Sequence, residues 1–285
     1  MILLADSGAT KTDWRVIDID RELEQITTLG FNPMYQESEE IYQVLHESLL
    51  PNLLNKAPSE IHYYGAGCST PDRNKRVADA LSRLFPEASI YIEHDLLAAA
   101  RAACGQEAGI ACIAGTGSNT CLYDGTDVID NIPSLGFLLG DEGSGAYMGK
   151  LLIRAYLYRE LPDELAKSLK NRFNLTKDIV LNEVYSAQVP SRYMATFAKF
   201  MHEKRKNPVI HAMIYESFAL LFERHISKYD GYPTLPVNFV GSVAYHFSDE
   251  LKQVAKKYGA KIGKIISSPS EGLIQYHQDL LKQKA

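Results

Sequence analysis

The chain of 285 residues lacks several features that would place it in a specialised class of protein. No run approaches the roughly 20 apolar residues that a membrane-spanning helix needs. The first six residues contain no basic segment and end on the charged Asp6, so we do not expect a signal peptide. The net charge of -5 argues against nucleic acid as the main partner, because a phosphate backbone requires a basic surface.

Cysteine is also scarce, and Gly/Ser-rich linkers and low-complexity segments are missing. The sequence contains no CxxC pair, so neither a disulfide framework nor a zinc site is predicted. We expect reduced thiols and a cytoplasmic protein. The four cysteines are Cys68, Cys104, Cys112 and Cys121. A hydrophobic content of 46% is that of a globular protein long enough for one large or two ordinary domains.

The pattern of apolar residues and turns predicts a three-stranded meander followed by alternating helix and strand, and this order occurs twice. The first copy has predicted strands at 1–5, 14–19, 25–31, 61–64 and 90–92, and helices at 37–50, 72–84 and 96–104. The second has predicted strands at 109–114, 120–123, 128–132, 237–240 and 261–266. Its helices are predicted at 248–258 and 270–284, with a long helical stretch at 144–229 that is broken near Pro162, Pro190 and Pro208.

The repetition suggests two similar lobes with a cleft between them, where small-molecule sites tend to form. We place the first lobe at 1–105 and the second at 106–271, with a helical insert at about 144–229. The closing helix, 272–285, is expected to pack back on the first lobe. The insert contains no motif with evident chemistry, so packing or a dimer contact is expected there.

The stretch "DSGATKTDW", from Asp6 to Trp14, follows the first predicted strand. It is not a Walker loop, because the lysine comes too early and no second glycine precedes it. Its hairpin turn exposes backbone N–H groups of Gly8, Ala9 and Thr10 that could bind phosphate, with hydroxyls from Ser7, Thr10 and Thr12 nearby. Asp6 could hold Mg²⁺ directly or through water. An ordinary hairpin with a polar turn remains open.

A second glycine-rich loop, "AGTGSNT" at 114–120, occupies the equivalent place in the second copy. Its glycines allow close approach of the backbone to a ligand, although a plain hairpin would also use them. Two opposed phosphate loops would clamp a polyphosphate. The stretch "GSVA" at 241–244 would let an adenine ring lie against the backbone. By contrast, "GAGCST" at 65–70 lacks the third glycine of a dinucleotide site.

Three acidic residues stand where helices are predicted to begin. Asp141 and Glu142, in "GDEGSG" at 140–145, could cap the following helix or bind sugar hydroxyls or metal. Asp95 could likewise cap the helix that follows it, or serve as a general base that takes a proton from a substrate hydroxyl.

Taken in order, these stretches resemble the N-acetylglucosamine kinase branch of the acetate kinase, sugar kinase, Hsp70 and actin superfamily, in the group that includes the dehydratase-activating ATPases. The resemblance covers nearly the whole chain, and "GDEGSGAYMG" is its most specific motif. It implies an α/β protein with a duplicated ribonuclease H-like, actin-like ATPase fold. It also implies ATP and Mg²⁺ as cofactors, an amino sugar as substrate and a homodimer.

The resemblance also implies roles for individual residues. Asp95 matches the catalytic base, and Asp6 the residue that faces Mg²⁺. The implied nucleotide-binding residues are Asp6, Gly8, Ala9, Thr10, Lys11, Thr12, Gly115, Thr116, Gly117, Gly241 and Ser242. The implied sugar-binding residues are Asn32, Asp95, Ser118, Asn119, Phe137 and Asp141.

Phe137 stands where the vertebrate enzyme has tryptophan, so the sugar could be N-acetylglucosamine, N-acetylmuramic acid or glucosamine. The expected reaction transfers the ATP γ-phosphate to the sugar 6-hydroxyl. Two other hypotheses about the function are open. One is an activator ATPase with an iron–sulfur cluster, for which Cys112 is the candidate ligand. The other is a sugar sensor that has kept the fold.

Overall fold

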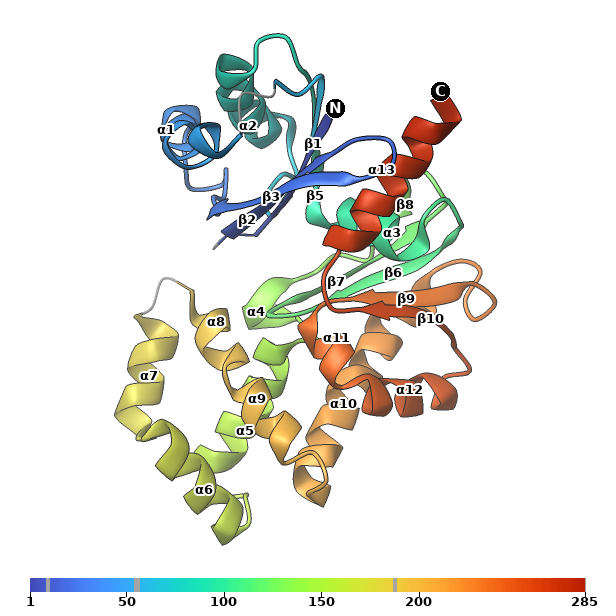
Figure 1. The fold of residues 1–285 in the computed structure, drawn as a ribbon. Helices are drawn as coiled ribbons and strands as arrows, with labels where there is room; N and C mark the ends of the chain where they lie inside the picture. The colour runs from blue at the N-terminus through green and yellow to red at the C-terminus, as the bar shows by residue number, and fades with distance from the viewer. Residues whose placement is uncertain (9–10, 54–56, 187–188, 285) are drawn as a thin grey trace. The chain divides into compact units, whose positions relative to one another are not determined.

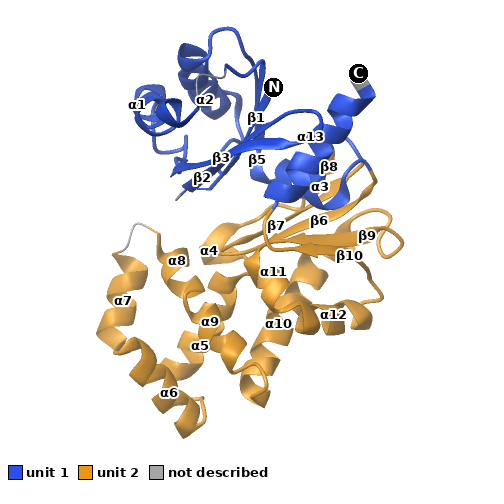
Figure 2. Cartoon of the chain, in the orientation of Figure 1, with its two compact units in different colours: residues 1–106, 125–127, 269–285 blue, residues 107–124, 128–268 orange. Residues whose placement is uncertain are grey.

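The protein, described here as a computed structural model, has determined positions for residues 1–8, 11–53, 57–186 and 189–284 (Figure 1). Ala9 and Thr10, both predicted to bind phosphate, lie outside the described residues. The chain forms two compact units (Figure 2). Unit 1 contains residues 1–106, 125–127 and 269–285, and unit 2 contains residues 107–124 and 128–268.

Unit 1 is built on a five-stranded sheet with the order β3-β2-β1-β4-β5. The strands are β1 (Ile2–Ser7), β2 (Lys11–Ile17), β3 (Glu22–Leu29), β4 (Glu60–Gly65) and β5 (Ser89–His94). The first three form an antiparallel meander, and β4 and β5 run parallel to β1. The sole tryptophan, Trp14, is buried in β2, where its Nε1 donates to Thr28 Oγ1 at 2.9 Å.

Helices cover both faces of this sheet, because successive side chains of a strand point to opposite faces. The helices are α1 (Ser38–Ser48), α2 (Pro71–Leu84), α3 (Asp95–Cys104) and α13 (Ser270–Lys284), with a short 3₁₀ turn at Leu50–Asn52. Leu3 and Ala5 share a core with α1 and α2, whereas Ile2 and Leu4 pack with Ile274 of α13. Helix α13 also packs on α3.

Unit 2 repeats the same strand arrangement in the order β10-β9-β6-β7-β8. The strands are β6 (Gly109–Ala114), β7 (Ser118–Tyr123), β8 (Val128–Asp130), β9 (Pro236–Val240) and β10 (Lys261–Ile266). Again the first three are antiparallel, and the last two are parallel to the first strand. The predicted repetition of a three-stranded meander followed by alternating helix and strand is therefore confirmed.

The helices of unit 2 are more numerous than the sequence pattern predicts. They are α4 (Gly136–Leu139), α5 (Gly145–Leu157), α6 (Asp163–Phe173), α7 (Lys177–Tyr185), α8 (Pro190–Ala195), α9 (Phe197–Glu203), α10 (Pro208–Arg224), α11 (Ser242–His246) and α12 (Ser248–Lys257), with a 3₁₀ turn at Ile226–Lys228. Helix α6 begins directly after Pro162, while α8 and α10 begin at Pro190 and Pro208. A further break comes at Asn174, whose φ of 48° ends α6.

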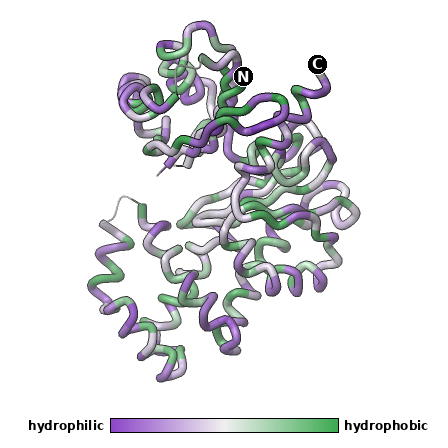
Figure 3. Tube along the Cα trace, in the orientation of Figure 1, coloured by the Kyte–Doolittle hydropathy of each residue, from purple (hydrophilic) through white to green (hydrophobic). Residues whose placement is uncertain are grey.

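The hydropathy of the residues agrees with this arrangement of helices around the two sheets (Figure 3). Peripheral helices of unit 2, such as α6 and α7, alternate between polar and apolar colours along their length, as amphipathic helices do (Figure 3). Within the described part of the chain, no helix has the length and apolar character needed to span a membrane.

Candidate functional site

The strands β1 and β2, which flank the predicted phosphate turn, pair antiparallel. Gly8 N donates to Lys11 O at 3.0 Å, and Ser7 pairs with Thr12 across the two strands. The hydroxyls of Ser7 and Thr12 lie 2.7 Å apart and both side chains are buried. In this structure the Thr12 hydroxyl therefore stabilises the base of the hairpin, while Lys11 is exposed at the start of β2.

Asp6 lies near the carboxyl end of β1, directly across from Asp13 in β2. Burial, followed by the negative charges of Asp13 and Asp95, raises the pKa of Asp6 to about 6. Asp13 is itself held by Arg15 at 2.8 Å and by the hydroxyl of Ser270 at 3.0 Å. A cation beside Asp6 would offset the negative charges of Asp13 and Asp95. The hard oxygens of the Asp6 carboxylate suit Mg²⁺, bound directly or through water.

Asp95 is the first residue of α3, and it is not the residue that caps the helix. His94 occupies the cap position, where its Nδ1 accepts from Leu97 N at 3.3 Å. Burial raises the pKa of Asp95, and backbone N–H groups of Leu96 and Asp95 itself oppose that shift. The capping interpretation of Asp95 is therefore not what the structure shows. A partly buried carboxylate with a raised pKa is suited to accepting a proton.

A pocket of about 370 Å³ lies in unit 1, and its wall includes His94, the residue before Asp95. It is lined by Cys68, Ser69, Thr70, Pro71, Asn74, Glu93 and His94, from the loop after β4, the start of α2 and the end of β5. The charge of Asp95 also acts on the Cys68 thiol, whose pKa burial raises to about 12. In the sequence, this loop is marked only by "GAGCST", which lacks the third glycine of a dinucleotide site.

Asn32, predicted to bind the sugar, lies against this same loop. Gly67 has a φ of 85°, and a Cβ atom there would come within 2.2 Å of Asn32 Oδ1. The close approach therefore requires glycine at position 67. Asn32 Oδ1 also accepts from Met34 N at 2.9 Å, which fixes the orientation of the side-chain amide.

In unit 2 the second glycine-rich loop is braced by the first turn of α5. Gly115 N donates to Gly117 O at 3.0 Å within the loop. Gly145 N and Ala146 N of α5 then donate to the carbonyls of Gly115 and Thr116 at 2.9 and 3.1 Å. The "AGTGSNT" and "GDEGSG" stretches are thus joined through their backbones.

Asp141 lies beside this loop and is 7% exposed. Its Oδ1 is 3.3 Å from Ser118 N, which donates to it, and 3.5 Å from Ser134 Oγ. A Cβ atom at Gly117 would sit 3.2 Å from the same oxygen, so this glycine leaves room for the carboxylate. Burial raises the pKa of Asp141, and the hydrogen bond from Ser118 opposes the rise.

The two acidic residues of "GDEGSG" have different surroundings, and neither caps the helix that follows. Ser144 is the N-cap of α5 and accepts from Tyr147 N at 3.1 Å. Glu142 is 2% exposed and forms an ion pair with Arg224. Of the two acidic residues, Asp141 therefore remains a candidate ligand for the substrate, whereas Glu142 does not.

The other predicted sugar ligands of unit 2 are engaged locally. Asn119 Oδ1 accepts from Thr120 N at 2.9 Å and from Asn131 Nδ2 at 3.1 Å. Phe137 lies in α4, where it lines an apolar pocket of about 290 Å³ together with residues of α5 and α7.

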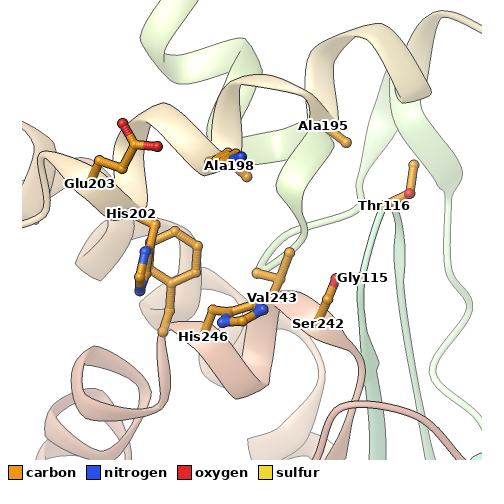
Figure 4. Close-up of a pocket in the computed structure, with 11 residues that line it drawn as sticks. Gly115, Thr116, Ala195, Ala198, His202, Glu203, Ser242, Val243 and His246 are labelled. Carbon is orange, nitrogen blue, oxygen red and sulfur yellow. The ribbon is translucent and has the colours of Figure 1, made fainter.

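A pocket of about 460 Å³ in unit 2 brings the second loop and the "GSVA" stretch together (Figure 4). Gly241 has a φ of 128°, and a Cβ atom there would be 2.4 Å from Ala114 O, so only glycine fits where the two segments meet. The lining residues are Gly115, Thr116, Ala195, Ala198, Lys199, His202, Glu203, Ser242, Val243, His246 and Phe247.

One wall of this pocket comes from α8 and α9, to which the sequence had assigned no site. The rings of His202 and His246 lie 5.6 Å apart, and His202 meets Phe247 edge-to-face at 5.3 Å. Burial, with Arg205 and His246 nearby, lowers the pKa of His202. The pocket therefore offers aromatic surfaces and one cation, Lys199, beside a glycine-rich loop.

Comparison with proteins of known structure gives matches across the whole chain. The protein named "Putative N-acetylglucosamine Kinase" from Porphyromonas gingivalis is 39% identical, with a TM-score of 0.93 over 98% of this chain and 99% of that one. A protein of the same name from Chromobacterium violaceum is 17% identical, with a TM-score of 0.75 over 96% and 98%. The ROK hexokinase of Thermus thermophilus is 13% identical, with a TM-score of 0.59 over 100% and 99%.

The last two likenesses show the fold alone, and they agree with the predicted duplicated actin-like ATPase fold. No match was found among curated proteins. The sequence matches the BadF/BadG/BcrA/BcrD ATPase family over residues 5–274. With this match and the 39% identical relative, the chain belongs to the BadF/BadG/BcrA/BcrD ATPase family.

Proposed function

We propose that the protein is an ATP-dependent amino sugar kinase, which transfers the γ-phosphoryl group of ATP to the 6-hydroxyl of N-acetylglucosamine or a closely related hexosamine. The observation that carries the proposal is the pocket of unit 2 in which Gly115, Thr116 and Ser242 lie together. Membership of an ATPase family and the name of the 39% identical relative support it.

In this proposal the pocket of unit 2 binds the nucleotide. The aromatic side chains of His202, His246 and Phe247 provide surfaces for the base, and the Gly115–Gly117 turn lies at the end expected to receive the phosphates. Close approach of a phosphate to backbone is possible at glycine, where no Cβ atom intervenes. Mg²⁺, when bound at Asp6, would neutralise charge on the phosphates.

Asp95 is proposed as the general base. Its carboxylate would accept the proton of the 6-hydroxyl as the oxygen attacks the γ-phosphorus and the bond to the ADP oxygen breaks. Phosphoryl transfer has a loose transition state, so most of the rate comes from positioning the two substrates. The raised pKa of Asp95 makes it a stronger base than an ordinary aspartate.

Asn32 and Asp141 are the proposed sugar ligands, together with the unit 1 pocket whose wall includes His94. That pocket contains one carboxylate, Glu93, while Arg73 donates to Ser69, another residue of its wall, at 3.1 Å. We propose N-acetylglucosamine as the substrate and keep N-acetylmuramic acid as the alternative to be tested.

A coupled assay of ADP release over a panel of sugars tests the proposal. The panel contains N-acetylglucosamine, glucosamine, N-acetylmuramic acid and glucose, and phosphorus NMR of the product identifies the phosphorylated oxygen. We expect N-acetylglucosamine to give the highest kcat/KM and a 6-phosphate product. Sugar-independent ATP turnover, with no phosphosugar formed from any member, would contradict the kinase assignment.

The iron–sulfur activator has less support from the structure. Cys112, its candidate cluster ligand, is fully buried in β6, and the three other cysteines are also buried. A sugar sensor would bind the same ligands, and the ADP-release assay separates it from a kinase.

A further inference from the structure

Glu142 is an acidic side chain buried in unit 2 for which the proposed reaction has no direct use. Arg224, the last residue of α10, donates from Nη1 to Glu142 Oε1. Nε2 of His225, the next residue, is 3.6 Å from the other carboxylate oxygen. Only 3% of the Glu142 side chain is exposed, so its carboxylate is committed to the end of α10.

The residue after Glu142 is anchored to the same helix. Gly143 N donates to the buried Ser217 Oγ at 3.1 Å. A Cβ atom at Gly143 would come within 2.6 Å of the Leu221 side chain, so the backbone is pressed against α10. Two consecutive residues of the "GDEGSG" stretch are therefore held by one helix.

This anchoring matters because Asp141 has an uncommon backbone conformation. Its φ of 63° is in the left-handed region, which persists in a non-glycine residue only where the surroundings hold it. The hydrogen bonds to the Asp141 carboxylate are long, 3.3 Å from Ser118 N and 3.5 Å from Ser134 Oγ. The carboxylate is therefore oriented mainly through its backbone, which Glu142 and Gly143 fix.

We propose that Glu142 and Arg224 form a positioning pair that sets the orientation of the Asp141 carboxylate for the amino sugar, without touching the substrate. This inference rests on the proposed function, in which Asp141 binds the sugar. The ion pair connects that carboxylate to α10, the longest helix of unit 2 in the described chain.

The exposures of the two partners allow a matched set of variants. Glu142→Gln keeps the shape of the buried side chain and removes its charge. Because 55% of the Arg224 side chain is exposed, Arg224→Lys keeps a cation beside Glu142, while Arg224→Met removes it. Val254→Ala, in the core of unit 2 on α12, serves as a control for general loss of stability.

We expect Glu142→Gln and Arg224→Met to raise KM for the sugar at least about tenfold, because a displaced Asp141 carboxylate loses its hydrogen bond to the sugar and lost binding appears in KM. The KM for ATP should stay within about twofold, since neither residue lines the nucleotide pocket. Arg224→Lys should restore most of the sugar KM. Val254→Ala should lower Tm and leave both KM values unchanged. A lower Tm in Glu142→Gln with an unchanged sugar KM would overturn the proposal.

A second readout requires no turnover, so it remains decisive if no sugar proves to be a substrate. The carboxyl carbon resonance of Asp141, assigned by its loss in Asp141→Asn, is followed by NMR during a pH titration. Glu142→Gln is left out of this readout, because the Glu142 charge itself raises the pKa of Asp141. The comparison is between two variants that keep Glu142: we expect the midpoint to move in Arg224→Met and to stay near the wild-type value in Arg224→Lys. An unchanged midpoint in Arg224→Met would overturn the positioning role, whereas a moved midpoint in a protein without sugar kinase activity would refute only the proposed function.

Discussion

Replacing Asp6 by asparagine should stabilise the protein at neutral pH in the absence of nucleotide and metal, although it removes a proposed functional group. Burial and the charges of Asp13 and Asp95 raise the pKa of Asp6 from 3.8 to about 6. At about 1.36 kcal/mol for each pKa unit, the ionised carboxylate destabilises the folded state by up to about 3 kcal/mol. Asp6 is only partly buried, so solvent screening reduces the expected gain to about 1–2 kcal/mol.

The sign of the effect depends on pH. Above pH 6 the Asp6 carboxylate is ionised in both the folded and the unfolded chain, and the destabilisation is fully present. Between pH 6 and 3.8 the folded state takes up a proton that the unfolded state does not, so the destabilisation is progressively lost. The advantage of Asp6→Asn should therefore be largest at pH 7 and should shrink by pH 5.

Urea unfolding, followed by the fluorescence of Trp14, measures the free energy of unfolding of the unit that contains Asp6, because Trp14 and Asp6 are both in unit 1. Wild type and Asp6→Asn are compared at pH 7 and pH 5 without ligands. Asp13→Asn is a poor control, since Asp13 has its own ion pair with Arg15. Lys11→Gln is unsuitable as well, because the Lys11 charge lowers the pKa of Asp6. Asp20→Asn, the same change at an exposed position of unit 1, is the better control. An Asp6→Asn protein less stable than wild type at pH 7, or equally stabilised at both pH values, would refute the electrostatic reasoning.

Other predictions follow from the site. Asp95→Ala should lower kcat by about a hundredfold or more with ATP affinity unchanged, measured by coupled assay and calorimetry; normal turnover would remove Asp95 from the reaction. In the wild type, kcat/KM should fall on the acid side, because protonation of Asp95 and of Asp6 (pKa about 6) disables them; a flat profile down to pH 5 would count against both roles. Gly241→Ala should weaken ATP binding more than sugar binding, since its Cβ would meet Ala114 O at 2.4 Å; equal losses for both ligands would indicate general disruption.

The local pattern of apolar and turn-forming residues was sufficient to predict most of the strands and helices. The strands β6 and β10 and the helix α13 have the predicted bounds, because apolar runs ending at glycine, proline or polar residues mark them clearly. The strand β2 begins at Lys11, three residues earlier than predicted, because Lys11 already pairs with Leu29 of β3. The break at Asn174 was missed, since asparagine in the left-handed conformation carries a weaker signal than proline.

The site was less predictable than the fold. Gly115, Thr116 and Ser242 lie in one pocket, as expected if all three bind nucleotide, and the glycines that allow this are visible in the sequence. Lys199 and His202 were missed, because their place in the pocket depends on how α9 packs and not on any motif. Glu142 could not be distinguished from Asp141 by sequence, since its partner Arg224 is 82 residues away along the chain.

The position of α13 also has a consequence for synthesis of the chain. Ile2, Leu4 and Ile17, made early, form an apolar surface whose cover includes Ile274 and Leu281, made near the end. Unit 2 lies between these segments in the sequence and can complete its core before α13 leaves the ribosome. The part of the first sheet that α13 covers therefore stays exposed during most of translation, although α3 already packs against β1 and β4. This apolar patch is the surface that a chaperone acting on the nascent chain would encounter.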